Sequence, residues 1–232
     1  MRNQFEKELQ QLNGEILRMG GLVEESVAQT ITALRNLDEE LARAIIAKDD
    51  MVDSMETKIE KHCLNLFALQ QPLAGDLRQI SSTLKLLTDL ERIADHASDI
   101  SELTIRLVGS PAGAVPASVF TMAEQAHNML RSCLDAFNRQ DVAAAQRVCD
   151  EDDVVDDYFN DIILERVNIM KADPGMVELS IDIMFIVKYL ERIGDHATNI
   201  AEWVIYSVTG QHAHLQHPER HPERDRLSAE EN

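Results

Sequence analysis

The chain has 232 residues, enough for one large domain or for two domains of about 100 residues each. Its net charge of −19 argues against direct binding to nucleic acid or to anionic lipid, and suits cations or a partner with a basic surface. No apolar run approaches the ~20 residues that span a bilayer. The start of the chain lacks the apolar segment of a signal peptide, and three widely spaced cysteines give no disulfide framework, so we expect a cytoplasmic protein.

Apolar residues recur at helical spacing through most of the chain, which predicts an all-α fold. The first helix carries an apolar stripe from Phe5 to Leu34 and ends before Asp38, a favourable N-cap for the second. Breaks at Gln71-Pro72 and Asp173-Pro174-Gly175 separate later helices. The expected ranges after the first helix are 39–69, 74–107, 117–138, 141–171 and 176–208.

This plan predicts two tandem, pseudo-symmetric three-helix bundles with up-down-up topology. The first bundle is expected at 1–108 and the second at 116–210, joined by a linker at 109–115 that is rich in Gly, Ser, Pro and Ala. From residue 211 to 232 the sequence is rich in His, Pro, Glu and Arg without periodicity, which predicts a disordered tail.

A repeated segment supports the duplication. The decapeptide at 91–100 returns 100 residues later at 191–200 with seven of its ten positions identical. The repeat keeps charged residues as well as apolar ones, whereas packing alone would mainly keep the apolar ones. We therefore expect this segment to carry function.

On a helix, the first copy places Glu91, Asp95 and Asp99 in a row at i, i+4 and i+8. Like charges at this spacing destabilise a helix by a few tenths of a kcal/mol per pair, and a solvated face more often alternates acids with Lys or Arg. An exposed acidic surface with no ligand remains an alternative. The second copy has the corresponding residues Glu191, Asp195 and Asn199.

The preceding helix of each half adds a second pair of acids at i, i+4 spacing. An antiparallel hairpin centred on Pro72 brings Asp53 opposite Glu91 and Asp49 opposite Asp95. Such a cluster is costly unless cations or protons neutralise it, and its oxygen ligands suit Mg²⁺, Mn²⁺, Ca²⁺ or iron, with room for more than one ion. The same pairing in the second half involves Asp152, Asp156, Glu191 and Asp195.

The basic residues of the repeat lie off this acidic row. We expect His96 and His196 to orient a carboxylate or to contact a neighbouring helix rather than to bind the metal directly. Arg92 and Arg192 are expected to pair with carboxylates on an adjacent helix or to face a partner.

Carboxylates in a helical bundle also suit two other functions, an oxidase and a cation-binding scaffold. Di-iron carboxylate oxidases need a Glu-x-x-His motif on two helices inside the bundle, and this chain has only one such motif, Glu124 with His127. A helical scaffold or store that only binds cations is the second alternative. No phosphate-binding loop or nucleophile constellation is present, so we expect no enzyme activity.

The paired Glu-Arg-Ile-x-Asp-His segments, the duplication and the six-helix plan resemble the PhoU family, the accessory proteins of phosphate-specific transport. Further matching segments are 19–24, 71–78 and 173–174, and the resemblance covers residues 3–208. It implies metal clusters on the bundle surface, of iron, manganese, magnesium or zinc and possibly multinuclear. The residues that match the family's metal motifs are Asp49, Asp53, Glu91, Asp95 and Asp99, and then Asp152, Asp156, Glu191, Asp195 and Asn199.

The resemblance also implies a regulatory role. Family members restrain the phosphate-starvation response and modulate phosphate uptake. They link the ATPase subunit of a phosphate ABC transporter to a sensor histidine kinase, and the resemblance also implies a homodimer. Asn199 stands where the first copy has Asp99, which puts equal metal occupancy of the two sites in doubt.

Overall fold

The computed structural model describes residues 2–70, 74–111 and 113–211. These residues form six long α-helices, as the periodicity predicted, and the predicted helix ends are about one residue from the observed ones. The expected linker lies between the third and fourth helices, and the expected tail from 212 onward lies outside the described residues. The helices are α1 (Arg2–Asn36), α2 (Glu39–Gln70), α3 (Ala74–Arg106), α4 (Ala117–Arg139), α5 (Val142–Ala172) and α6 (Val177–Thr209).

Side-chain caps fix several helix ends. The Asp38 carboxylate accepts a hydrogen bond of 3.0 Å from the Leu41 amide at the start of α2, which confirms the predicted N-cap. Asp141 caps α5 in the same way, through the Ala144 amide. The stop predicted at Asp173 is followed by a 3₁₀ turn over Pro174–Met176 before α6 begins.

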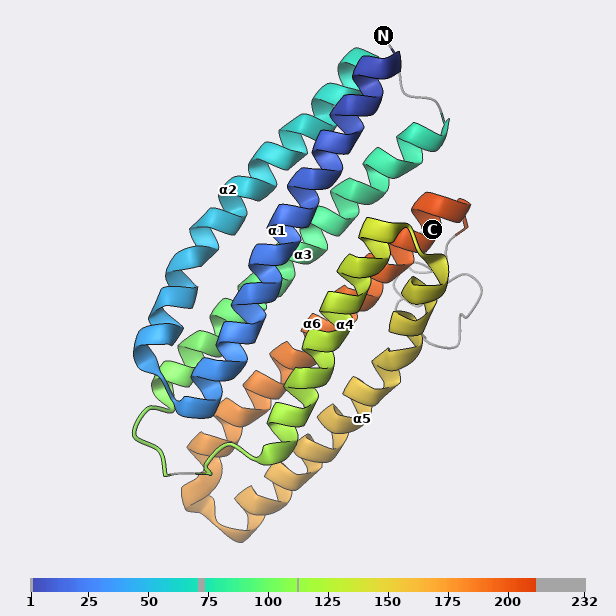
Figure 1. Ribbon diagram of the computed structural model, residues 1–232. Helices are drawn as coiled ribbons and strands as arrows, with labels where there is room; N and C mark the ends of the chain where they lie inside the picture. The colour runs from blue at the N-terminus through green and yellow to red at the C-terminus, as the bar shows by residue number, and fades with distance from the viewer. Residues whose placement is uncertain (1, 71–73, 112, 212–232) are drawn as a thin grey trace, which may run out of the picture.

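The six helices form two three-helix bundles that lie side by side (Figure 1). Within the bundles α2 packs against α1 and α3, and α5 packs against α4 and α6. Between the bundles α3 packs against α6 and α1 packs against α4, so these four helices surround the centre of the molecule. The predicted fold is thus confirmed.

The two bundles share one apolar core. Buried side chains from all six helices form a single cluster. Burial of apolar surface at about 25 cal/mol per Å² is the main stabilising term for such a fold. Members with no more than 1% exposure include Leu12, Ile16, Met19, Leu90, Ile100, Met122, Val155, Ile162 and Ile193.

Two glycines permit close helix contacts. A Cβ at Gly20 of α1 would lie 2.6 Å from a methyl group of Leu134 on α4, at the contact between the bundles. A Cβ at Gly194 would lie 3.3 Å from a Val155 methyl, so glycine brings α6 close to α5. The first copy of the repeat has Ala94 at the corresponding position.

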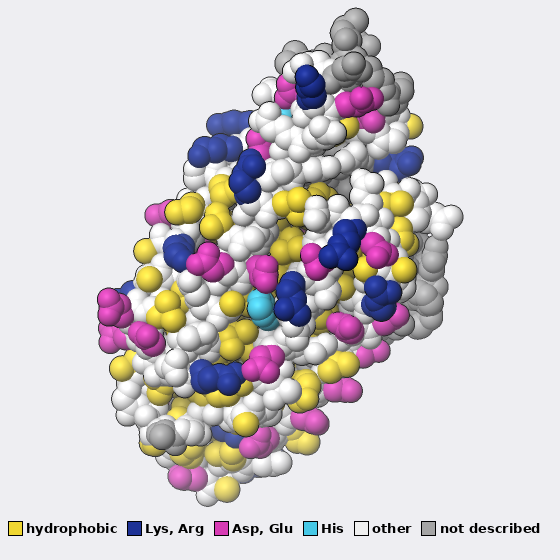
Figure 2. Space-filling view, in the orientation of Figure 1, with side chains coloured by type: hydrophobic (Ala, Val, Ile, Leu, Met, Phe, Trp, Pro, Cys, Tyr) yellow, Lys and Arg dark blue, Asp and Glu magenta, His cyan; other side chains and the backbone are white. Residues whose placement is uncertain are grey.

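The surface is charged but not uniformly acidic. Figure 2 shows acidic and basic side chains interspersed on the face where α1 and α4 lie in front. All three cysteines are free, with Cys63 and Cys133 buried and Cys149 partly exposed. Within the described ranges, none of the helices is both long and apolar enough to cross a membrane.

Candidate functional site

The acidic side chains of the first half gather along the line where α2 lies beside α3. Glu91, on α3, has an 18% exposed side chain, whereas Asp95 and Asp99 are 32% and 40% exposed. On α2, Asp49 is half-buried and Asp53 is exposed. We call this group the α2–α3 face: Asp49, Asp53, Glu91, Asp95 and Asp99.

Burial and mutual repulsion among these acids weaken Asp49 as an acid. Partial burial, followed by the nearby charges of Asp95, Asp53, Asp50 and Asp99, raises the pKa of Asp49 to about 6. Of these charges, Asp95 has the largest effect, in agreement with the facing pair expected from the hairpin. The structure therefore brings the acids of the two helices together, and the proton of Asp49 is lost near pH 6 instead of near pH 4.

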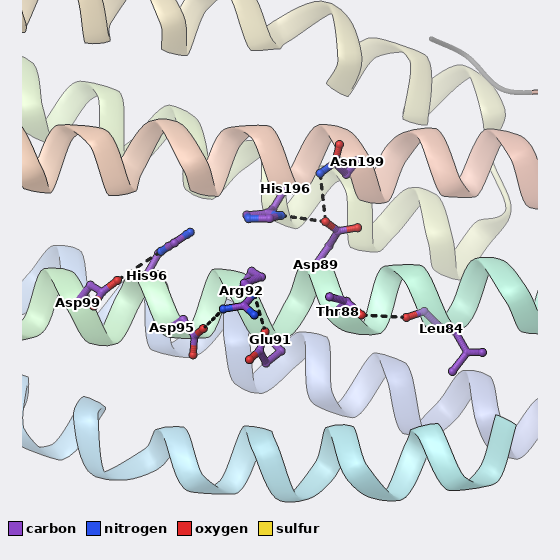
Figure 3. A network of polar contacts seen from close by, with 10 residues as sticks. All are labelled: Leu84, Thr88, Asp89, Glu91, Arg92, Asp95, His96, Asp99, His196 and Asn199. Carbon is purple, nitrogen blue, oxygen red and sulfur yellow. Dashed lines mark hydrogen bonds and ion pairs between the residues drawn. The ribbon is translucent and has the colours of Figure 1, made fainter. Parts of the chain in front are cut away.

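The other α3 acids share this environment. Partial burial and the charge of Asp95 raise the pKa of Glu91, which the neighbouring Arg92 guanidinium opposes. Partial burial raises the pKa of Asp99 as well, against the attraction of Arg192 from α6. Arg92 contacts Glu91 at 3.3 Å and Asp95 at 3.0 Å, so its carboxylate partners lie on its own helix (Figure 3), not on an adjacent helix as expected.

The α2–α3 face supplies the oxygen donors that a hard or borderline cation needs, and partial burial with like charges makes a cation favourable there. In the described residues, however, no three His, Cys, Asp or Glu side chains are already arranged to hold a metal ion. A bound ion would therefore draw the carboxylates inward or keep water among its ligands, as Mg²⁺ usually does.

The second half places its equivalent residues between α5 and α6, and we call this group the α5–α6 face. Asp152 and Asp195 are half-buried and Asp156 is exposed. Glu191 is engaged by the ammonium of Lys188, which lies 2.7 and 2.6 Å from its two carboxylate oxygens. Asn199, counted among the candidate ligands, donates instead to Asp89 of α3 at 3.1 Å.

Three substitutions between the halves reduce the negative charge of the α5–α6 face. Thr88 of the first copy is replaced by Lys188 in the second, and Asp99 by Asn199. On the neighbouring helix, aligned through the Asp-Asp-x-Val-Asp segments at 49–53 and 152–156, Glu56 corresponds to Phe159. The Lys188 ammonium lies 5.1 Å from the centre of the Phe159 ring.

A polar network joins the halves where α3 packs against α6. The ring of His196 contacts the Asp89 carboxylate through Nδ1 at 2.8 Å, and Asn199 donates to the same oxygen (Figure 3). Asp89 is only 8% exposed. Two donors therefore satisfy a buried carboxylate that would otherwise be strongly destabilising.

His96 lies beside this group and is 6% exposed. Its ring stacks on Tyr189 with centroids 5.4 Å apart, and its Nδ1 is 3.5 Å from Asp99. Burial, and then the charges of His196 and Arg192, lower the pKa of His96 to about 4. Both histidines thus contact a carboxylate and the neighbouring helix, as the sequence predicted.

The sequence alone did not identify Asp89 as part of a polar site. Its position is adjacent to the apolar arc of α3, and an acid there requires buried donors. Helical spacing predicts which side of α3 carries Asp89. It does not predict which helix packs against that side, so the pairing of Asp89 with α6 could not be predicted.

The two residues of the Glu-x-x-His motif differ in exposure, since Glu124 lies on the surface and His127 is partly buried. Glu124 pairs with Arg35 of α1 at 2.7 Å, and both side chains are at least 50% exposed. The closest carboxylate contact of His127 is Glu24 at 3.6 Å. This arrangement lacks the inward-facing carboxylates of di-iron oxidases.

The chain matches known proteins over nearly its whole length. The PhoU domain family model matches residues 16–104 and again residues 119–204, once in each bundle. A phosphate-specific transport system accessory protein PhoU homolog of Clostridium acetobutylicum is 40% identical over 212 residues, which cover 91% of this chain and 97% of the relative. A homolog of the same name in Pseudomonas aeruginosa is 40% identical over 210 residues, covering 89% of this chain and 86% of the relative.

Solved structures agree with the arrangement of helices. The crystal structure of PhoU from Pseudomonas aeruginosa superposes with a TM-score of 0.85 and 38% identity, covering 89% of this chain and all of that one. The phosphate transport system regulatory protein PhoU from Streptococcus pneumoniae also gives 0.85, with 29% identity over 90% of this chain and 99% of that one. The chain belongs to the PhoU family of phosphate transport accessory proteins.

Proposed function

We propose that this protein is a metal-binding regulatory adaptor of phosphate transport. The observation that carries the metal-binding part is the α2–α3 face, where partial burial and opposing carboxylates raise the pKa of Asp49 to about 6. A divalent or trivalent ion bound there would relieve this repulsion. Asp49, Asp53, Glu91, Asp95 and Asp99 would supply the ligands, and the protein acts by binding rather than by catalysis.

Each part of the α2–α3 face has a distinct role in this proposal. Asp49 and Asp95 face each other from different helices, so a shared ion would fix α2 against α3. Arg92 neutralises part of the face without an ion, through its contacts with Glu91 and Asp95. Binding an ion would therefore free Arg92 for a partner surface.

The regulatory part rests on family membership. The relatives are named as accessory or regulatory proteins of phosphate transport. We propose that this chain likewise restrains the phosphate-starvation response and limits phosphate uptake. Its partners would be the ATPase subunit of the phosphate transporter and a sensor histidine kinase, reached from the cytoplasm by a homodimer.

A cation scaffold or store without a phosphate role is the competing function. It shares the metal-binding surface but predicts no effect on phosphate signalling. A di-iron oxidase is not supported by the exposed position of Glu124.

Deletion of the gene in its host tests the regulatory role. We expect phosphate-scavenging genes to be expressed at high phosphate, and the wild-type gene to restore repression. Affinity capture of the tagged protein from the host membrane fraction is expected to recover the transporter ATPase or the sensor kinase. Unchanged expression together with failure to capture either partner would contradict the regulatory role and favour the scaffold.

A double variant tests the assigned metal ligands. Asp95→Ala combined with Asp195→Ala is expected to remove bound metal, as measured by elemental analysis of protein purified without a His-tag or chelator. Asp76→Ala is a matched control, because Asp76 is an α3 acid in the first turn of the helix, far along the chain from Glu91. Unchanged metal content in the double variant would refute the assigned ligands.

A further inference from the structure

The two histidines of the repeat meet across the contact between the bundles. Their ring centroids are 5.7 Å apart, although the residues are 100 positions apart in the chain. Equivalent residues of the two copies thus face each other across a local twofold relation between α3 and α6.

Each ring has its Nδ1 atom directed at a carboxylate. The contact of His196 with Asp89 is short, at 2.8 Å, and that of His96 with Asp99 is longer, at 3.5 Å. A carboxylate on one ring nitrogen is the usual support for a histidine whose other nitrogen binds a metal, because it fixes the tautomer and the ring orientation.

The opposite nitrogens lie toward each other. In Figure 3 the end of each ring away from its dashed line points to the other ring. The Nε2 atom of His96 is buried and has no hydrogen-bond partner. An unpaired buried nitrogen costs free energy, of the order of 1–3 kcal/mol, unless a ligand satisfies it.

We propose that His96 and His196 form a metal site separate from the acidic faces, in which the Nε2 atoms of both rings bind one late first-row transition ion such as Zn²⁺. A Zn–N bond is about 2.0–2.1 Å and a ring centre lies roughly 1 Å beyond its nitrogen, so two rings on one tetrahedral ion have centres about 5 Å apart. The observed separation of the ring centres is 5.7 Å, slightly longer than this, so a bound ion would draw the two rings a little closer together.

The surroundings favour this class of ion over the hard cations of the acidic faces. Neutral imidazole prefers zinc, copper or nickel, whereas Mg²⁺ and Ca²⁺ prefer oxygen. The side chain of His196 is 22% exposed, so an ion and the waters that complete its coordination have access from solvent. A bound ion would connect α3 to α6 and hold the two bundles together.

The test uses the full chain with its tail histidines His212, His214, His217 and His221 each changed to Gln, because these would bind zinc independently. His96→Phe removes one ligand and retains an aromatic ring to stack on Tyr189. His127→Phe is the matched control, since His127 is also partly buried on a helix but has no histidine ring as a neighbour among the described residues. His96→Gln serves as a second variant.

Each protein is stripped with chelator and titrated with Zn²⁺ alone and with Cu²⁺ alone. We expect the His96 variants to lose one equivalent of zinc, or to bind it at least tenfold more weakly, while His127→Phe binds as the parent does. In the protein loaded with one equivalent of Cu²⁺, the nitrogen hyperfine coupling in the electron paramagnetic resonance spectrum should indicate two imidazole ligands in the parent and in His127→Phe, and no more than one in the His96 variants. Zinc should also raise the melting temperature of the parent but not of His96→Phe.

Equal zinc uptake by all of these proteins, or a parent copper spectrum without nitrogen coupling, would overturn the proposal and leave the two rings as a packing contact. The result is separate from the function proposed above. An Asp49→Asn, Asp95→Asn variant reports on the α2–α3 face through Mn²⁺ binding and leaves both rings in place.

Discussion

The α2–α3 face and the α5–α6 face arise from two copies of one sequence, yet their acids have different partners. In the first, Glu91 and Asp95 share the charge of Arg92, and Asp49 is repelled by acids on both helices. In the second, Lys188 occupies both oxygens of Glu191. The two copies thus keep four of the five carboxylate positions but differ in the charged groups that surround them.

The same difference extends to the contact between the bundles. Asp99 remains near the acidic face and close to His96, whereas its counterpart Asn199 donates to Asp89. An amide can donate to a buried carboxylate, and a second carboxylate cannot. Asn199 therefore donates a hydrogen bond to Asp89 of the first half, which an ionised aspartate at position 199 could not do.

The largest expected effect on stability comes from losing the hydrogen bond between Asn199 and Asp89. Asn199→Asp would set two carboxylates against each other in a partly buried contact and should destabilise the protein by about 2–3 kcal/mol at pH 7. Urea unfolding measures the change. Asp89→Asn added to Asn199→Asp restores one donor and one acceptor, so the double variant should recover part of the loss; equal destabilisation by both would contradict the assigned hydrogen bond.

A smaller effect concerns Asp49 in metal-free protein. Its pKa in the folded state is raised to about 6 from an ordinary value of 3.8, so the folded protein binds this proton more tightly than the unfolded chain. Stability from this group is present below about pH 4 and is lost as the pH rises through 6. With allowance for solvent screening, Asp49→Asn should stabilise the metal-free protein by about 1 kcal/mol at pH 8 and should change little at pH 4.

Thermal melting at the two pH values checks this prediction, and an increase in melting temperature of about 2–4 °C at pH 8 is expected. The same substitution at Asp152 is the comparison from the other half. A loss of stability in Asp49→Asn at pH 8 would show that the carboxylate is not under repulsion.

The smallest expected effect concerns Lys188, a basic residue that the α5–α6 face has and the α2–α3 face lacks. Thr88→Lys should place an ammonium near Glu91, as Lys188 lies near Glu191, and weaken Mn²⁺ binding at the α2–α3 face about fivefold. Lys188→Thr should strengthen binding at the α5–α6 face by a similar factor. Isothermal titration of the two variants measures both, and changes in the same direction would contradict the role assigned to Lys188.

Much of this arrangement could be predicted from the sequence because it depends on local rules. The apolar period set the six helices, Asp38 set a helix start, and the hairpin geometry placed Asp49 near Asp95. The partners between the bundles could not be predicted, because periodicity does not tell which helices of two separate bundles meet. Asp89 and Tyr189 acquire their roles only from the packing of α3 against α6.

The pair of Lys188 with Glu191 was visible in principle, since the two residues stand at i and i+3 on one helix. The partners of Arg92 were likewise local, at Glu91 and Asp95, although an adjacent helix was expected. In both examples the basic residue lies one or three positions from its carboxylate on the same helix, so the ion pair depends on local spacing alone.

Unequal cation binding by the two faces is tested most directly by Mn²⁺ titration of three metal-free proteins. The wild type is compared with Asp49→Asn, Asp95→Asn and with Asp152→Asn, Asp195→Asn, using electron paramagnetic resonance to count free Mn²⁺. We predict that the tighter class of sites disappears in the first variant and persists in the second. Loss of the tighter class in the Asp152, Asp195 variant alone, or equal losses in both, would contradict tighter cation binding at the α2–α3 face.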